Sequence, residues 1–228
     1  VHQVYGVGDG DSYHAALSAE MAFNEFSGVS YLPFSAMHFL EYGADYMHVN
    51  FPRDTFVIGI SASGGSARVV QSLERAKNVS NKIITAALVG KIESPLANVA
   101  ERVLSVQIPE LGRSPGLRTY AASLMGMFAL AIRIGEIKRK YHMKEANALR
   151  QEIINMADMV KATYKAAIDP VFKAAKMCQS APFISYVGSG PSFGTACFSS
   201  AKIVEAAGVF ATAQDLEEWA HVERFAYP

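Results

Sequence analysis

Residues 58–66 read IGISASGGS, an apolar run that passes through a loop of serine and glycine into a segment with helical spacing. A buried strand followed by a short loop and a helix is the repeating unit of a parallel sheet with crossover helices. Hydroxyls and glycine N–H groups at a helix start also offer several neutral donors to one anion. The stretch predicts an α/β fold, and the loop is either a phosphate-binding loop or a plain serine-rich turn.

The same alternation of strand and helix patterns runs through the first 110 residues or so. Strands are predicted at 3–7, 29–34, 56–60, 82–89 and 103–108, with helices at 12–26, 35–42, 66–78 and 95–100. A largely buried helix is then predicted at 119–140, and an amphipathic helix at 144–177 acts as a connector. After Pro182 the pattern resumes, with strands at 183–187 and 209–213 around a helix at 192–207.

An internal repeat links the two ends of the chain. Three positions of the first glycine turn line up with three of a later turn: Gly8, Gly10 and Ser12 with Gly188, Gly190 and Ser192. Each set follows an apolar strand and opens a helix. Because far fewer residues follow the second turn than the first, the second copy is incomplete. We therefore expect a first domain at 1–140, a helical connector at 141–181 and the start of a second domain at 182–228.

Composition excludes several classes of protein. The 228 residues are 50% hydrophobic and 18% charged, which is typical of a globular protein. Lys plus Arg and Asp plus Glu both number 21, so no cationic field predicts nucleic acid as a partner. Two cysteines, Cys178 and Cys197, make neither a disulfide framework nor a zinc motif. We expect a cytoplasmic protein without metal or cofactor, and no membrane span, because polar residues interrupt the apolar run at 121–134.

The first glycine turn differs from the nucleotide-binding loops it resembles. Residues 6–12 read GVGDGDS, so Asp11 stands where a dinucleotide fingerprint has its third glycine. Its carboxylate would repel a pyrophosphate. The Gly-Lys-Ser/Thr of a Walker loop does not occur either. Ser12 is expected to cap the following helix, and its hydroxyl also suits a ligand contact.

Four stretches together resemble the sugar isomerase (SIS) domain family, especially the isomerase half of the glutamine–fructose-6-phosphate transaminases. They are residues 10–15 (GDSYHA), 60–64 (ISASG), 93–97 (ESPLA) and 188–190 (GSG). The resemblance implies a three-layer α-β-α sandwich with a five-stranded parallel sheet. It also implies that a sugar phosphate is held by Ser61, Ser63, Gly64 and Ser66, with Ser12 nearby. Gly188, Ser189 and Ser192 form the corresponding loop of the second copy.

The resemblance also extends to residues that would do chemistry. Residues 201–206 (AKIVEA) are similar to the family's Lys-x-x-Glu segment, which implies that Glu205 moves a proton between sugar carbons C1 and C2 and that Lys202 lies near the sugar. Residues 215–221 (DLEEWAH) are similar to its Glu-Leu-Lys-His, which implies that His221 assists ring opening. Without the resemblance, Glu205 is expected to be a solvated residue on the surface of a helix, and His221 a packed helix residue.

These features predict a protein that binds a phosphosugar or an amino-sugar phosphate. The resemblance implies a ketose/aldose isomerase or an amino-sugar-phosphate deaminase or deglycase. The alternative is a phosphosugar-sensing module without catalysis, since such a sensor needs the phosphate loop but no proton shuttle. An incomplete second sheet exposes an edge, so we expect a homodimer.

Overall fold

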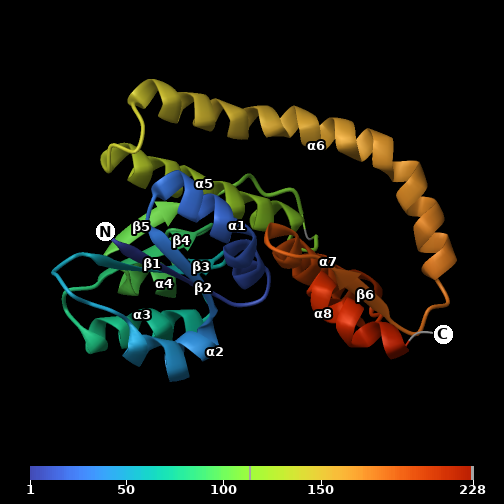
Figure 1. Ribbon diagram of the computed structural model, residues 1–228, viewed down its shortest axis with the longest axis horizontal. Helices are drawn as coiled ribbons and strands as arrows, with labels where there is room; N and C mark the ends of the chain where they lie inside the picture. The colour runs from blue at the N-terminus through green and yellow to red at the C-terminus, as the bar shows by residue number, and fades with distance from the viewer. Residues whose placement is uncertain (113, 227–228) are drawn as a thin grey trace.

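The computed structural model describes residues 1–112 and 114–226, and a five-stranded parallel sheet lies at its centre (Figure 1). The strand order is β2-β1-β3-β4-β5, and each neighbouring pair is parallel. The strands are β1 (Gln3–Gly8), β2 (Ser30–Ser35), β3 (Thr55–Ser61), β4 (Ile84–Val89) and β5 (Arg102–Ser105). Every residue of β3 is buried, as expected for a strand covered on both faces. The predicted sheet is confirmed, although its last strand ends at Ser105 instead of Ile108.

Helices cover both faces of this sheet and complete three layers (Figure 1). One face carries α1 (Asp11–Ser27) and α5 (Leu117–Ile137), and the other carries α2 (Ala36–His38), α3 (Ala67–Val79) and α4 (Pro95–Val99). Each face has its own apolar core, one centred on α3 and the other between α1 and α5. The single helix predicted at 35–42 is wrong in part, because α2 passes into a π-helical turn at Phe39–Gly43 and a 3-10 turn at Ala44–Tyr46.

Helix α5 is long and apolar enough to cross a membrane by length and composition. It packs against α1, and its residues Met127, Ala131 and Ile132 are completely buried. These contacts are those of a core helix in a layered α/β fold.

A smaller unit follows at the C-terminal end of the described residues. It contains β6 (Ile184–Val187), α7 (Pro191–Ala207), β7 (Ala211–Gln214), α8 (Leu216–His221) and a 3-10 turn at Glu223–Ala226. Strands β6 and β7 form a two-stranded parallel sheet. The turn that opens α7 repeats the turn that opens α1: Gly10 has φ 51° and ψ −127°, and Gly190 has φ 57° and ψ −132°. The repeat seen in the sequence is therefore also a repeat of backbone conformation.

This turn corrects the prediction for Ser12. Helix α1 begins at Asp11 with Gly10 in the cap position, and no side chain caps it. The Ser12 N–H donates to the Asp9 carbonyl at 3.1 Å, so Ser12 lies within the first helical turn. A left-handed glycine, not a serine hydroxyl, makes the sharp turn from strand to helix.

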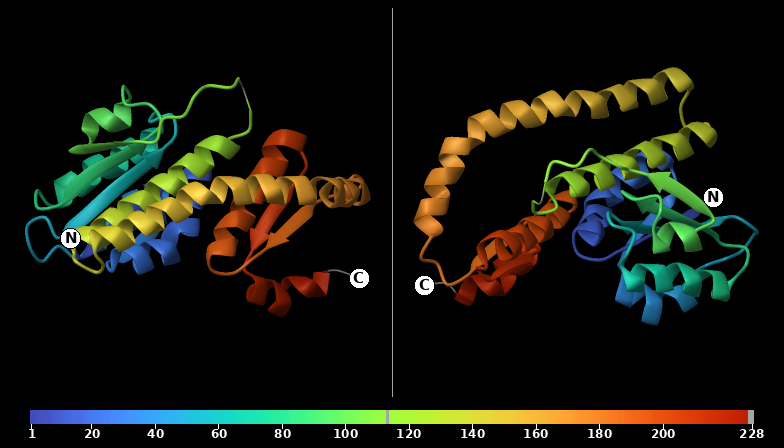
Figure 2. Two further views of the ribbon diagram at one scale, coloured as in Figure 1. Left: turned by 90° about the horizontal axis from the view of Figure 1, so that it is seen from above. Right: turned by 180° about the vertical axis from the view of Figure 1, so that it is seen from behind.

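Helix α6 (Met143–Cys178) connects the two units and is 36 residues long. Figures 1 and 2 show it leaving the end of α5 and arching over to β6. Ala146 is buried where α6 packs on α5, whereas most of the helix from Ile154 onward is exposed. Pro170 stands inside the helix, where its ring removes one backbone hydrogen bond and favours a bend.

The smaller unit is attached to the first one through α7, which packs against α1. A Cβ atom at Gly194 would lie 2.3 Å from Ser18 Oγ and 2.6 Å from Ser18 N, so only glycine permits this close approach. The Tyr120 ring of α5 stacks on Phe198 at 3.8 Å between centroids, and the Tyr120 hydroxyl is 2.8 Å from Ser18 Oγ. Helix α7 thus rests on both α1 and α5.

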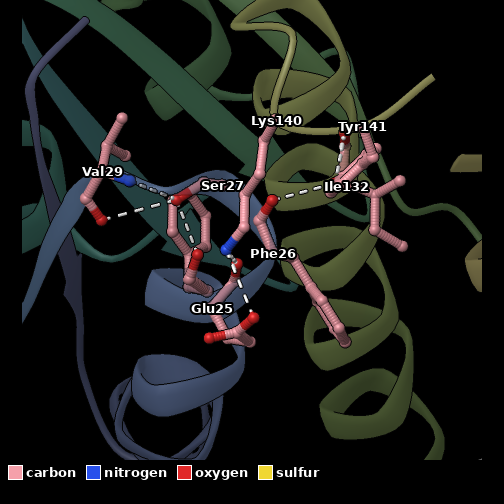
Figure 3. Close-up of polar contacts among 8 residues, drawn as sticks. Glu25, Phe26, Ser27, Val29, Ile132, Lys140 and Tyr141 are labelled. Carbon is pink, nitrogen blue, oxygen red and sulfur yellow. Dashed lines mark hydrogen bonds and ion pairs between the residues drawn. The ribbon is translucent and has the colours of Figure 1, made fainter.

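Polar contacts fix the far ends of α1 and α5 to each other (Figure 3). The Tyr141 hydroxyl lies 2.9 Å from the Phe26 carbonyl and 2.9 Å from the Ile132 carbonyl. The Lys140 ammonium donates to the Glu25 carbonyl, and Val29 N donates to Ser27 Oγ at 3.1 Å. The Glu25 and Phe26 carbonyls, which are left over at the end of α1, therefore find donors in this junction.

We expect Tyr141→Phe to lower the free energy of unfolding by about 1 kcal/mol, because two half-buried carbonyls lose a shared donor. Urea unfolding followed by circular dichroism measures the change. Tyr46→Phe is the control, since Tyr46 is 81% exposed and should leave the midpoint unchanged. Equal midpoints for Tyr141→Phe and the native chain would contradict a stabilising role for this junction.

Candidate functional site

The serine loop follows β3 and ends at the start of α3. Two of its hydroxyls accept hydrogen bonds within the loop: Gly64 N donates to Ser61 Oγ at 3.1 Å, and Gly65 N donates to Ser63 Oγ at 3.2 Å. A hydroxyl that accepts in this way still has its own O–H to donate. The loop is therefore shaped by its serines and still offers donors at the N-terminus of α3.

Gly64 brings the loop against the start of α4. Its φ is +67°, and a Cβ at this position would lie 2.1 Å from Ser94 Oγ. Gly64 O accepts from Leu96 N at 2.9 Å, and Ala62 O accepts from Gly90 N at 3.0 Å. The Ser94 hydroxyl is buried and makes no hydrogen bond within the described residues. Ser94 thus adds a hydroxyl at the loop that sequence reasoning missed, although the stretch 93–97 was singled out.

A carboxylate from the first glycine turn also reaches this loop. Ser66 Oγ donates to Asp9 Oδ2 at 2.7 Å, and Ala36 N donates to Asp9 Oδ1 at 3.3 Å. The contact follows from the topology, because the carboxyl ends of the neighbouring strands β1 and β3 lie side by side. Asp9 was not predicted as a site residue. It places a negative charge beside the hydroxyl of Ser66, which was predicted to bind phosphate.

Lys202 and Glu205 meet on α7, where an acid from α1 joins them. Lys202 Nζ lies 2.5 Å from Glu205 Oε2 and 2.7 Å from Asp11 Oδ2. The Lys202 side chain is only 11% exposed, whereas that of Glu205 is 50% exposed. Burial lowers the pKa of the Lys202 ammonium, but its hydrogen bonds with Asp11 and Glu205 outweigh this and raise the pKa above its usual value. Lys202 is therefore a charged group at neutral pH.

His221 lies at the end of α8, away from these contacts. Its Nε2 is 2.8 Å from Glu217 Oε1, and the two side chains are 70% and 75% exposed. Near it, Asp215 caps α8 by accepting from Glu217 N at 2.9 Å, and the Ser189 hydroxyl donates to Asp215 at 2.8 Å. These bonds lower the pKa of the Asp215 carboxyl. The loop of the second copy is thus closed onto α8.

The structure therefore gathers the predicted residues into separate groups. Ser61, Ser63 and Ser66 share the loop at α3, and Lys202 with Glu205 lies at the contact between α7 and α1. Among the described residues, no hydrogen bond or ion pair joins these two groups, and none joins His221 to either. In the described part of the chain, no three His, Cys, Asp or Glu side chains lie close enough together to hold a metal ion.

A cavity of about 620 Å³ opens beside the serine loop. Ala62 of the loop and Gly90 after β4 line one side, and residues 106–112, 114–116, 118, 119 and 123 line the other. Lys91 and Arg118 bring positive charge to its wall. The cavity lies at the carboxyl ends of parallel strands, where open α/β sheets bind ligands.

A sequence model of the SIS domain matches residues 1–133. The chain belongs to the SIS domain family. The glutamine–fructose-6-phosphate aminotransferase of Sulfurisphaera tokodaii is 27% identical over 221 residues, which cover 96% of this chain and 34% of that enzyme. The enzyme of the same name from Clostridium tetani is 23% identical over 223 residues, which cover 97% and 35%. This SIS chain spans about a third of the length of these relatives.

Solved structures share the SIS fold. The C-terminal domain of glucosamine-fructose-6-phosphate aminotransferase from Francisella tularensis matches with a TM-score of 0.84 at 16% identity, over 99% of this chain and 62% of that one. Glucosamine-6-phosphate deaminase from Thermotoga maritima matches with a TM-score of 0.72 at 16% identity, over 99% and 64%. The fold match extends through the connector and the smaller unit.

We expect Gly64→Ala to destabilise this SIS chain, because an alanine pays about 1–2 kcal/mol for a left-handed conformation and its Cβ would also collide with Ser94. Differential scanning calorimetry should show a lower Tm. Gly65→Ala is the matched control, since a Cβ there meets Ser63 Oγ at an ordinary 3.6 Å. A similar Tm for the two variants would argue against a strained loop at Gly64.

Proposed function

We propose that this SIS chain binds a phosphosugar or an amino-sugar phosphate in the cytoplasm and acts on it as a ketose/aldose isomerase or an amino-sugar-phosphate deaminase or deglycase. The serine loop at the start of α3 carries the proposal, because it combines free hydroxyl donors with a left-handed glycine. Related proteins with this fold are named as a glucosamine-6-phosphate deaminase and a tagatose-6-phosphate ketose/aldose isomerase. Their names support the substrate class and the type of reaction.

In this proposal the loop holds the phosphate. Ser61 and Ser63 donate their hydroxyls, the backbone at Gly64 approaches the anion closely, and Ser12 adds a further donor. Ser66 joins them only when its hydroxyl turns from Asp9 to the phosphate. The N-terminus of α3 adds the favourable end of its dipole. The sugar chain would then extend toward the cavity beside Ala62.

Glu205 is the proposed base. For the isomerase, its carboxylate takes the proton from C2 of the open-chain aldose, or from C1 of the ketose in the reverse direction. The C–H electrons form the C1=C2 double bond, and the displaced carbonyl electrons go to the carbonyl oxygen, which takes the proton of the neighbouring hydroxyl as the carbonyl shifts from one carbon to the other. The same carboxyl then returns the proton to the neighbouring carbon, so no co-reactant is consumed. The Lys202 ammonium at 2.5 Å keeps positive charge beside the base and the developing enediolate.

His221 is proposed to open the sugar ring, since an imidazole both takes and gives a proton near neutral pH. Its 70% exposure leaves it accessible to a site on another chain. The loop formed by Gly188, Ser189 and Ser192 is proposed to be structural, because the Ser189 hydroxyl is already donated to Asp215.

One observation favours the second candidate, a phosphosugar sensor without catalysis. Hydrogen bonds shape the serine loop, and among the described residues none links it to Glu205 or His221. A sensor needs only the loop, so binding and chemistry must be measured separately.

Proton–deuterium exchange at C1 and C2 of fructose 6-phosphate and glucosamine 6-phosphate in D₂O tests the proposal. We expect the native chain to exchange and Glu205→Gln to be slower by about 10²–10⁴-fold, which is the usual contribution of a general base. Glu152→Gln on the exposed part of α6 is the control and should retain the native rate. Calorimetric binding of both sugars without exchange would instead support the sensor.

We further propose a homodimer, with α6 contributing to its interface. Exposed apolar residues recur every four positions along this helix, at Met156, Val160, Tyr164, Ile168 and Phe172. They continue the face on which Ala146 is buried and Ile153 is half-buried. A second copy of the chain, carrying the same stripe, is a matching occupant of this face.

Light scattering after size-exclusion chromatography tests the dimer. We expect twice the 24.7 kDa chain mass for the native protein and a monomer for the double variant Val160→Glu/Ile168→Glu. Asn155→Glu/Ala162→Glu changes the exposed face on the opposite side of the helix and should remain dimeric. A dimer that survives the first pair of substitutions would exclude this stripe from the interface.

A further inference from the structure

The Asp11–Lys202 ion pair spans 191 positions of the sequence and joins the first unit to the second. Asp11 stands in the first turn of α1, where the helix dipole stabilises a carboxylate. Lys202 stands three residues before Glu205 on α7, with the Phe198 ring 5.1 Å from its ammonium. The lysine, whose side chain is 11% exposed, is thus held between an acid of its own helix and an acid of another.

Packing fixes the position of Asp11. A Cβ at Gly116, just before α5, would lie 2.4 Å from Asp11 Oδ2, so the carboxylate is enclosed between the start of α5 and α7. The other oxygen, Oδ1, is buried and has no hydrogen-bond partner among the described residues. If the Asp11 carboxylate turned toward solvent, its ion pair with Lys202 would be broken.

The two acids do not contribute equally to the lysine. The Asp11 side chain is 24% exposed and that of Glu205 is 50% exposed, so water screens the Glu205 contact more strongly. His14 also faces this group, and burial lowers the pKa of its imidazole, which leaves it neutral at neutral pH. Asp11 is therefore the counter-charge that contributes most to the raised pKa of the Lys202 amine.

We infer that Asp11 is a positioning residue: it fixes the position of the Lys202 ammonium and, through Lys202, holds the Glu205 carboxylate in place. The consequence for catalysis rests on the proposed function. A protonated amine has no lone pair to attack a ketose carbonyl, so Lys202 serves as a fixed positive charge beside the base and not as an imine-forming nucleophile. Asp11, which sequence reasoning treated only as an obstacle to nucleotides, supports the proton transfer from outside the α7 segment.

Chemical labelling of Lys202 tests the ion pair without any substrate. The rate of acetylation by acetic anhydride, followed at this lysine by mass spectrometry, reports the fraction of neutral amine. We expect Asp11→Asn to increase the rate at Lys202 about tenfold, which corresponds to a fall of one pKa unit. Asp11→Ser, which is smaller and cannot crowd the site, should do the same. Asp9→Asn is the matched control, because it removes the same charge from the same turn. Asp9 accepts from Ser66 and does not contact Lys202, so the labelling rate of Lys202 should not change.

Proton exchange then tests the effect on Glu205. We expect Asp11→Asn to slow C1/C2 exchange and to shift its pH profile, while the calorimetric affinity for fructose 6-phosphate changes less than twofold. Equal labelling of Lys202 in the native chain, Asp11→Asn and Asp11→Ser would overturn the inference. So would an exchange rate and pH profile that Asp11→Asn leaves unchanged. If the native chain binds sugar but does not exchange, the proposed reaction fails, and the labelling rates alone still decide whether Asp11 fixes Lys202.

Discussion

Close packing around α1 is the constraint on which the rest of the structure depends. Small residues let α1 lie on the sheet and against two other helices at once: Ala15, Ala16 and Ala19 are completely buried, and Gly194 of α7 touches Ser18. A larger side chain at such a crossing would push α7 away, because interiors are packed without spare volume. The Lys202–Asp11 ion pair and the stacking of Phe198 on Tyr120 both require α7 to lie this close to α1.

The three inner strands of the sheet, β1, β3 and β4, were predictable from sequence because they are buried almost throughout and consist mostly of apolar residues. The helix at 35–42 was less predictable, since the change to a wider turn at Phe39–Gly43 depends on packing and leaves no periodic signal. The cap at Ser12 was wrongly predicted for a related reason. Serine is the common choice at a helix start, but the positive φ of Gly10 moved the start one residue earlier.

The serines of the loop could be found in the sequence because they are adjacent in the chain. The acids that face the site could not, since Asp9 lies 57 positions from Ser66 and Asp11 lies 191 from Lys202. Such pairs are created by the strand order and by the packing of α7 on α1, neither of which a local pattern contains. The buried hydroxyl of Ser94 was missed for the same reason, as its neighbour Gly64 is on another strand-to-helix connection.

The arch of α6 has a geometric consequence for how the family can vary. A helix of 36 residues is roughly 54 Å long at 1.5 Å per residue, and here both of its ends are tied to the same body, through α5 at one end and α7 at the other. The two ends of α6 are therefore held at a fixed separation. One residue inserted into α6 would lengthen the helix by about 1.5 Å and rotate the residues beyond it by about 100°. Insertions and deletions are tolerated more easily near Pro170, or in the segment between α6 and β6, than in the part of α6 before Pro170. The length of α6 is thus set by the distance between its contact with α5 and the unit that α7 attaches to α1.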